Sequence, residues 1–365
     1  MSVIIPAFNE EQNIAATVMS VYHNRYAHKE IIVVNDGSTD NTAHEVEKLA
    51  ERYPGTIRLI TIPNGGKANA LNIGVAEAKH EVVITMDGDT VFAHDTIEHL
   101  IKHFGDPRVG SVAGKVCVAD SNRVLGAFQS AEYIVGQNIE KRGLATVNGI
   151  HVVPGPIGAW RKSDMLRAGG YGHNTLVEDQ DMSFAIQTLG QRIVYEPNAR
   201  SFTETPGSVR DFAKQRFRWV YGTLQCLWKY KWYSFNFRRP SLGFVVIPNN
   251  VLANFLIPLT SPVIDLLGLY AVLFGASSQV AQMYLFFLIF DFAYCSIAFA
   301  LERSNFRLLL FIPLQRLFYR FLMHYIILKS VIKALEGTGT LWDKVKRTGC
   351  TGEYYRQSLS ATPAG

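Results

Sequence analysis

The chain has 365 residues, of which 48% are hydrophobic and 18% are charged, and its formal net charge is +5. These values exclude a disordered chain, a collagen-like repeat and a small disulfide scaffold, and the length suits about two domains. The composition is uneven, because residues 242–299 contain only two charged side chains, Asp265 and Asp291. We therefore expect a water-soluble region that is followed by a membrane region.

The N-terminal region alternates between apolar segments and helical patterns. The apolar segments have the composition of strands and lie at Ser2–Pro6, Glu30–Asn35, Ile57–Ile62 and Val82–Met86. Helical patterns lie between them, at Glu10–His23, Asn41–Arg52 and Lys67–Lys79. This alternation predicts βαβ units and a mostly parallel sheet of the α/β class. Right-handed crossovers place the loops that follow the strands along one edge of the sheet, where ligands bind.

Two acidic turns follow strands of this sheet, Asn35-Asp36-Gly37 and Asp87-Gly88-Asp89. Since both come after strands, we expect them to face the same crevice. Asp87 and Asp89 can offer carboxylate oxygens to a hard divalent cation that also binds phosphate oxygens. Each turn alone is more simply explained as an ordinary Asp-Gly β-turn, but two such turns in one sheet favour a site.

Asn64-Gly65-Gly66-Lys67 opens a helix and brings a cation to backbone N–H groups that can bind a phosphate. Its spacing matches neither a P-loop nor a dinucleotide fingerprint, because Thr61 and Ala68 occupy two of the P-loop positions. The sequence therefore favours neither ATP nor a dinucleotide, and an ordinary helix start is the alternative.

Two further motifs carry side chains suited to sugar and phosphate chemistry. Glu178 and Asp179 begin a helical segment, where a carboxylate can accept a proton from a hydroxyl nucleophile, although acids are also common in first helical turns. Gln215, Arg218 and Trp219 share one face of a helix and combine an amide, a guanidinium suited to phosphate and a ring suited to a sugar face. An interfacial membrane anchor is the alternative for this second motif.

Two apolar segments, Val251–Phe274 and Val280–Leu301, are long enough to span a bilayer. A third, Leu308–Leu335, either spans the membrane or lies in its interface with its cations reaching the surface. Those cations are Arg316, Arg320, Lys329 and Lys333. If the soluble region and the basic segment Lys344–Arg347 are both cytoplasmic, the crossings number two, or four with a break near Pro313.

The segment 210–239 holds eight Lys or Arg and only one acid, together with Trp and Tyr residues. Basic and aromatic residues directly before an apolar segment indicate the cytoplasmic face of a bilayer. Nucleic acid is a weaker alternative that nothing else in the chain supports, so we expect no nucleic-acid partner. The four cysteines are far apart, match no metal-binding spacing and are expected to be free thiols.

The four motifs, in this order and before apolar spans, resemble the D, DxD, [T/A]ED and Q[Q/R]xRW series of processive family 2 glycosyltransferases. That group includes the cellulose, chitin, hyaluronan and poly-N-acetylglucosamine synthases, and the fit is closest to bacterial poly-N-acetylglucosamine synthase-like members, including those fused to deacetylase domains. The resemblance extends from Val3 to Gly349, with Val177 in place of the usual Thr or Ala. Members usually carry one or two membrane helices before the catalytic domain, and no such apolar segment precedes Val3.

The resemblance implies a GT-A catalytic domain, with a Rossmann-like, mostly parallel sheet, that binds a UDP-sugar and Mg²⁺ or Mn²⁺. The resemblance places Asp36, Ala7, Asn9, Glu10 and Lys67 in the nucleotide pocket, where Asp36 would contact the uridine. Asp87 would hold the donor sugar or ribose side, and Asp89, with Asp87, the metal on the diphosphate.

The same resemblance assigns the chemical step to the later motifs. Asp179 would be the general base, with Glu178 beside it, and Trp219 would stack on the acceptor sugar. Gln215, Arg216 and Arg218 would neutralise the leaving diphosphate, while Gly155 lies in the segment that shapes the acceptor site.

We therefore expect a multi-pass enzyme of the inner or plasma membrane with a cytoplasmic catalytic domain. It would extend a β-linked polysaccharide from a UDP-sugar, first of all UDP-N-acetylglucosamine, and export the product, with export or deacetylase subunits as candidate partners. The regions are a catalytic domain (1–208), a basic and aromatic interfacial region (209–241), membrane helices (242–336) and a tail (337–365). A transferase that adds one sugar to a lipid carrier, a non-catalytic sugar-nucleotide-binding subunit and a passive channel are the alternatives.

Overall fold

The computed structural model describes residues 1–120, 124–275, 278–302, 306–336 and 349–361. The four predicted strands are present as β1 (Ser2–Ala7), β2 (Glu30–Asp36), β3 (Ile57–Ile62) and β4 (Val82–Thr85). They pair in parallel, with Val3 of β1 opposite both Ile31 and Ile84. The helices α1 (Ile14–Tyr22), α2 (Thr42–Arg52) and α3 (Lys67–Glu77) lie between them in the chain, so this part of the prediction is confirmed.

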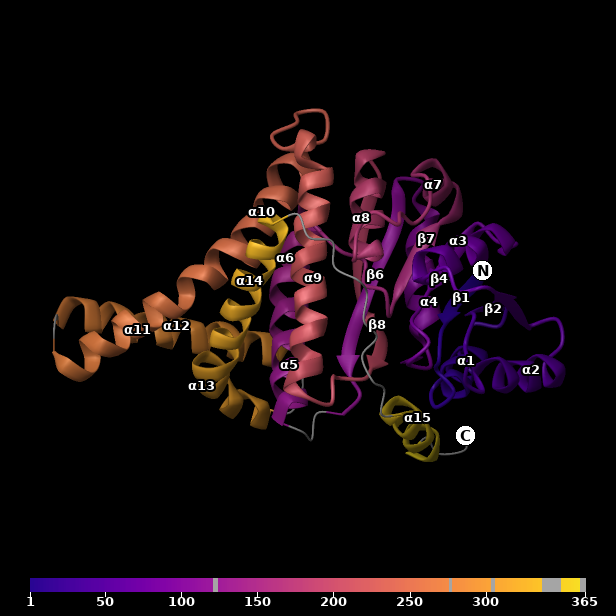
Figure 1. Cartoon of the computed structure of the whole chain (residues 1–365), viewed down its shortest axis with the longest axis horizontal. Coiled ribbons are helices and arrows are strands. Elements are labelled where there is room, and N and C mark those ends of the chain that lie inside the picture. The colour runs from indigo at the N-terminus through magenta and orange to yellow at the C-terminus, as the bar shows by residue number, and fades with distance from the viewer. Residues whose placement is uncertain (121–123, 276–277, 303–305, 337–348, 362–365) are drawn as a thin grey trace.

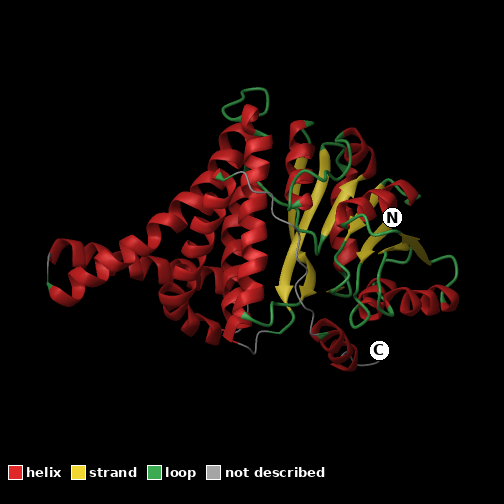
Figure 2. Ribbon diagram, viewed as in Figure 1, coloured by secondary structure: helices red, strands yellow, loops and turns green. Residues whose placement is uncertain are grey.

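Four strands that the sequence patterns did not reveal complete the sheet. They are β5 (Thr90–Phe92), β6 (Val109–Val118), β7 (Gly158–Arg161) and β8 (Arg192–Thr203). The order across the sheet is β3-β2-β1-β4-β7-β6-β8-β5, and β7 runs antiparallel to both β4 and β6. The sheet is therefore mixed, with its parallel half at the N-terminal end of the chain (Figure 2).

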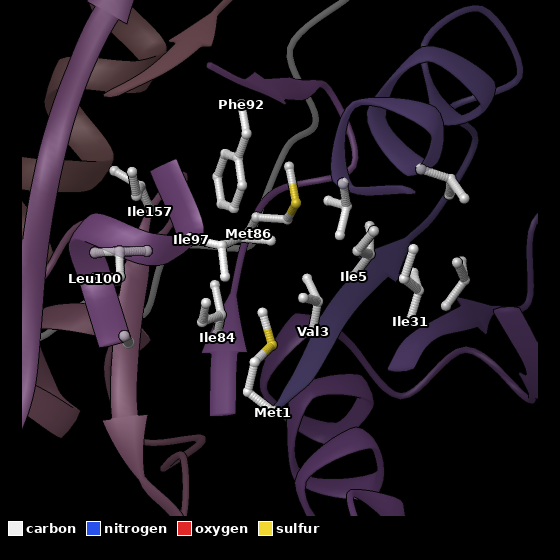
Figure 3. Packing of buried hydrophobic residues seen from close by; sticks show 14 of the residues in the cluster. Met1, Val3, Ile5, Ile31, Ile84, Met86, Phe92, Ile97, Leu100 and Ile157 are labelled. Carbon is white, nitrogen blue, oxygen red and sulfur yellow. The ribbon is translucent and has the colours of Figure 1, made fainter. Parts of the chain in front are cut away.

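Within the parallel half of the sheet, β1 and β2 are buried along their whole length, which explains why they are mostly apolar, whereas β3 at the sheet edge is only partly buried. On one face a cluster of buried side chains packs against α1 and α4 (Thr96–Ile101), and Figure 3 labels ten of its members. On the other face α3 approaches so closely that a Cβ atom at Gly74 would lie 2.3 Å from Cγ2 of Ile4. This packing fixes the ends of β1, β2 and β4, from which the acidic turns project.

A layer of helices stands beside the half of the sheet that contains β6 and β8 (Figure 1). It contains α5 (Val124–Val135), α6 (Lys141–Thr146), α9 (Val209–Lys229) and α14 (Arg320–Leu335). Helix α9 begins where Ser208 caps it, since the Ser208 hydroxyl accepts a hydrogen bond from the amide of Asp211. Phe212 of α9 and Ile326 of α14 share one buried cluster, which joins these two helices.

Among the described residues, two helices are long and apolar enough to cross a membrane by length and composition. The first runs from Ser241 to Phe274 through α10 (Ile247–Val251) and α11 (Ile257–Phe274), and the second is α12 (Ser278–Glu302). They project together away from the sheet (Figure 1), and large side chains such as Leu273 and Phe286 are 65% and 71% exposed. An apolar surface of this kind marks a membrane or protein contact.

The third apolar segment changes its backbone conformation close to Pro313. After a 3-10 turn (Phe306–Phe311), a helix runs from Ile312 to Leu335, with Pro313 in its first turn. Arg316 and Arg320 do not both reach toward water, because Arg316 is only 7% exposed and binds Asp265 and Asp291, and Arg320 pairs with the same two acids. A charge in apolar surroundings is costly unless it is paired, which explains the arrangement.

The last described element is α15 (Cys350–Ala361), which packs against α1 at the opposite end of the molecule from the α11–α12 hairpin (Figure 1). The basic segment Lys344–Arg347 and most of the predicted tail before α15 lie outside the described residues. None of the four cysteines, all of which lie in the described part of the chain, forms a disulfide bond with another.

Candidate active site

A cavity of about 1080 Å³ brings the later motifs together with the end of β4. Ten of the predicted site residues line it: Lys67, Asp87, Asp89, Gly155, Glu178, Asp179, Gln215, Arg216, Arg218 and Trp219. They come from α3, the turn after β4, the loop before β7, α8 (Glu178–Thr188) and α9. Residues that lie more than 100 positions apart in the chain therefore meet in one concave site.

Lys67 is the cation that joins the acidic motifs. Its Nζ lies 2.6 Å from Oδ1 of Asp87 and 2.7 Å from Oε1 of Glu178. Burial opposes the charge of Lys67, but the carboxylates of Asp87, Glu178 and Asp179 outweigh it and raise the pKa of Lys67. Lys67 thus remains protonated and holds the turn after β4 against the start of α8.

Gly155 lies directly against this ion pair. A Cβ atom at position 155 would lie 3.0 Å from Nζ of Lys67 and 3.3 Å from Oδ1 of Asp87, so a side chain there would crowd the pair. The amide of Gly155 also donates to Oδ2 of Asp179 at 3.0 Å. Gly155 therefore lies against the pair of Lys67 and Asp87 and also binds Asp179, the predicted base.

Asp179 and Glu178 are adjacent carboxylates in different electrostatic settings. Burial and the negative charge of Glu178 raise the pKa of Asp179 to about 6, although Lys67 and the amides of Gly155 and Gln180 oppose the rise. Burial alone would also raise the pKa of Glu178, but Lys67 and Arg218 lower it. Such a division gives one carboxyl that titrates near neutral pH beside one that stays ionised, as acid–base catalysis requires.

Replacing Lys67 with methionine is expected to abolish most transfer activity and to raise the pKa of Asp179, because the acids lose their shared cation. The activity–pH profile of the residual enzyme should shift to higher pH, and its Michaelis constant for donor should rise about tenfold or more. Lys162→Met is the matched control, since Lys162 binds only backbone carbonyls of Ala76 and Ala78 on the surface side of α3. An unchanged pH profile for Lys67→Met would contradict this account.

The predicted nucleotide residues near β1 and β2 lie beside this cavity and do not line it. Asp36 is buried, and its carboxylate accepts hydrogen bonds from the amides of Gly65 and Gly66 at 2.7 and 2.9 Å. Ala7 is buried at the end of β1, and Asn9 has a positive φ of 52°, with its side chain bound to the amide of Thr39. Asp36 therefore holds the loop that precedes Lys67.

Glu10 lies next to the acidic turn after β4. A Cβ atom at Gly88 would lie 3.2 Å from Cγ of Glu10 and 3.2 Å from the carbonyl oxygen of Pro6. The loop after β1 and the turn that carries Asp87 and Asp89 are thus in contact, as expected for loops at one sheet edge.

The motif on α9 divides between the cavity and the helical layer. Arg216 is 5% exposed, and its guanidinium forms two hydrogen bonds with Glu132 of α5, at 2.8 and 2.6 Å. It also lies 4.6 Å from the ring centre of Trp219, so it supports that ring from within the protein. The charge of Arg216 is therefore already compensated by the carboxylate of Glu132.

Sequence reasoning missed the cavity residues of the α5–α6 region, among them Glu132, Lys141 and His151. Burial lowers the pKa of Lys141 to about 7 and that of His151 to about 4. The segment has no motif, and its only sequence indication is the presence of charged residues such as Glu132, Glu140 and Lys141 in an otherwise mixed helical stretch.

The cavity continues from Trp219 to the apolar helices. Its far wall includes the polar side chains of Asn254, Ser261, Asp291, Arg316 and Arg320. Asp291, Arg316 and Arg320 thus lie at the edge of the same space that holds Asp179.

The mixed sheet with acidic turns at its edge is the GT-A arrangement, and residues 2–165 match the family model described as glycosyl transferase family 2. Residues 2–165 are therefore similar to a family 2 glycosyltransferase domain. Among curated proteins it is similar to the poly-beta-1,6-N-acetyl-D-glucosamine synthase of Staphylococcus aureus (strain COL), with 32% identity over 220 residues, 60% of this chain and 53% of the relative. The corresponding Staphylococcus epidermidis protein is 30% identical over 243 residues, 66% of this chain and 59% of the relative.

The chain thus spans little more than half the length of these curated relatives. A solved structure, the mannosyltransferase PcManGT from Pyrobaculum calidifontis in complex with GDP-Man and Mn2+, has the same fold. It superposes with a TM-score of 0.66 at 20% identity and covers 93% of this chain and 87% of its own.

Proposed function

We propose that the protein is an inverting, metal-dependent glycosyltransferase that adds a sugar from a UDP-sugar, with UDP-N-acetylglucosamine first, to a growing β-linked polysaccharide. The observation that carries the proposal is the network in which Lys67 joins Asp87 to Glu178 beside Asp179. It lies in one cavity with Arg218 and Trp219. The names of the curated relatives support a β-linked N-acetylglucosamine product.

In this proposal Asp179 removes the proton from the acceptor hydroxyl as that oxygen attacks the anomeric carbon. The bond from this carbon to the diphosphate breaks on the opposite side, so an α-linked donor gives a β-linkage. Arg218 and Gln215 stabilise the departing negative charge, because both line the cavity near the acids. Trp219 offers its ring to the acceptor sugar, while Arg216, bound to Glu132, positions that ring.

The residues present fit a divalent cation. Asp87 and Asp89 both line the cavity and supply hard oxygen ligands, and Asp89 is only 1% exposed. In proposed sites of this kind, Mg²⁺ or Mn²⁺ is held by one or two carboxylates together with the phosphates of a bound donor. When bound, the cation would neutralise charge on the diphosphate.

Chelation is accordingly expected to abolish transfer, and Mn²⁺ or Mg²⁺ should restore it. Asp89→Asn should lower activity by about 10²-fold or more and raise the Mn²⁺ concentration needed for half-maximal rate, because a neutral amide is a weaker ligand. Asp95→Asn is the control, since Asp95 lies outside the cavity on the surface. Full activity of the wild type in excess chelator would refute the metal requirement.

We place the protein in the cytoplasmic membrane, with residues 1–208 in the cytoplasm, α11 and α12 as spans and the basic, aromatic region 209–241 at the interface. Trp228 and Trp232 are 72% and 82% exposed, and Lys231 lies over both rings, as in an interfacial belt. The polar far wall of the cavity gives a growing glycan a path toward the membrane helices, which supports coupled export.

The deciding experiment supplies purified protein in membranes with Mn²⁺ and a panel of UDP-sugars and GDP-mannose, and follows nucleotide release and product mass. Long products from one UDP-sugar support the proposal. A single sugar added to a lipid carrier would support the non-processive alternative, and binding of the donor without release would indicate a non-catalytic subunit.

A further inference from the structure

Helix α15 lies away from α11 and α12 and packs against α1 and β5, beside the turn at Asp87–Asp89 (Figure 1). Thr351 of α15 is fully buried, and its hydroxyl donates a hydrogen bond of 3.0 Å to Oδ1 of Asn13, which is also fully buried. Tyr355, one turn later, is 8% exposed, and its hydroxyl lies 2.8 Å from Nδ1 of His23. Helix α15 therefore contacts residues at both ends of α1.

Helix α1 positions two segments of the proposed donor site. The amides of Asn13 and Ile14 donate to the carbonyl of Glu10 at 3.0 and 2.9 Å, which fixes the end of the loop after β1. The hydroxyl of Thr17 donates to the carbonyl of Gly88 at 2.9 Å, between Asp87 and Asp89. A displacement of α1 would therefore move the acidic turn as well as the loop.

A second contact of α15 reaches the other flank of the same turn. The ring of Tyr354 lies 4.4 Å from that of Phe202 in β8, and Phe202 pairs with Val91 of β5. Strand β5 begins at Thr90, directly after Asp89. Helix α15 thus contacts α1, which binds the turn through Thr17, and also β5, which follows the turn that carries the proposed metal ligand.

We infer that α15 is a positioning element for donor binding, and that Thr351, through Asn13, sets the placement of the loop at Glu10 and the turn at Asp87–Asp89. This inference rests on the proposed function. Loss of the Thr351 hydroxyl would leave Oδ1 of Asn13 buried without its partner, and α1 would move to relieve that cost. Donor affinity would then fall although no residue of the cavity has changed.

The test compares Thr351→Val with Thr351→Ser in the full chain, purified in detergent. Thr351→Val should weaken binding of UDP or GDP in the presence of Mn²⁺, and raise the Michaelis constant for donor, by about three- to tenfold with kcat nearly unchanged. Thr351→Ser keeps the hydroxyl and should restore both values. Arg356→Ala is the control, because Arg356 is exposed and its Nε binds only the carbonyl of Gly352 in its own helix.

The outcomes separate the inference from the proposed function. If the wild type binds neither nucleotide with Mn²⁺, both the proposed function and the role of α15 are refuted. If the wild type and Thr351→Val bind equally, or if Thr351→Val lowers only kcat and the melting temperature, the proposed function stands and the positioning role is refuted.

Discussion

Replacing Asp179 with asparagine is expected to lower the rate of sugar transfer by about 10²–10⁴-fold, the usual contribution of a general base. The amide has nearly the same shape and can still accept a hydrogen bond from Gly155 or Gln180, but it cannot accept a proton. The measurement is nucleotide release in membranes, with nucleotide binding by the same variant as the test of an intact site. Turnover equal to that of the wild type would remove Asp179 from the role of base.

The same residue predicts the pH dependence of the wild type. Since the pKa of Asp179 is raised to about 6, the value of kcat/KM should increase with pH through that value and level off above it. The rise of kcat/KM with pH reflects deprotonation of Asp179, so the pH profile of Asp179→Asn should lack this rise. A wild-type profile that is flat between about pH 5 and 8 would contradict the assignment.

Asp179 should also lower the free energy of unfolding at the pH values at which it is ionised and can act as a base. Its pKa in the folded protein lies above the value of about 4 expected in the unfolded chain, so the unfolded chain loses the proton first as pH rises. Stability is therefore lost between about pH 4 and 6 and remains lower above that range. At pH 8 Asp179→Asn should raise the free energy of unfolding by up to about 3 kcal/mol, seen as a higher melting temperature in detergent, and at pH 4 this gain should vanish.

The second large effect is expected at Arg316, which lies between two acids of the apolar helices. Its guanidinium is 2.8 Å from Asp265 and 2.6 Å from Asp291, and both Arg316 and Asp265 are less than 9% exposed. Arg316→Leu leaves Asp265 with the hydroxyl of Tyr284 at 3.2 Å and Arg320 at 3.7 Å, and leaves Asp291 with Arg320 at 3.4 Å. Breaking a buried pair in this way destabilises a protein by about 3–5 kcal/mol, which should lower the melting temperature in detergent by several degrees.

Lys333→Ala provides the matched control for Arg316→Leu. Lys333 lies on the same helical segment and forms an exposed pair with Glu336 at 2.7 Å. Exposed pairs contribute about 0–1 kcal/mol, so the control should melt close to the wild type. Equal melting temperatures for the two variants would show that the pair between Arg316 and the acids does not hold the hairpin.

The sequence was most informative where local pattern and fold coincide. The strands β1, β2 and β4 are mostly buried, so their apolar composition identified them, and the acidic turns after β2 and β4 had to follow at one sheet edge. By contrast, β7 has only four residues, and β8 contains Glu196, Pro197 and Asn198, which interrupt any alternation. Their pairing depends on contacts between distant parts of the chain that no local pattern encodes.

The candidate site shows the same division. Motifs identified which side chains belong to it, but not that Lys67 bridges Asp87 and Glu178, nor that Arg216 is bound by Glu132. Residues such as Lys141 and His151 line the cavity without any motif. A motif records residue types in order along the chain, whereas ion pairing depends on the direction of each side chain in the folded protein.

The cluster of Asp265, Asp291, Arg316 and Arg320 also has a consequence for biogenesis. Both acids precede both arginines in the chain. Asp265 of α11 and Asp291 of α12 are therefore synthesised before the arginines that pair with them. With α11 and α12 in a bilayer, as proposed, the nascent hairpin would carry two uncompensated acids, which hydrocarbon disfavours. Stable insertion of the hairpin would then wait until the chain has been synthesised through Arg320.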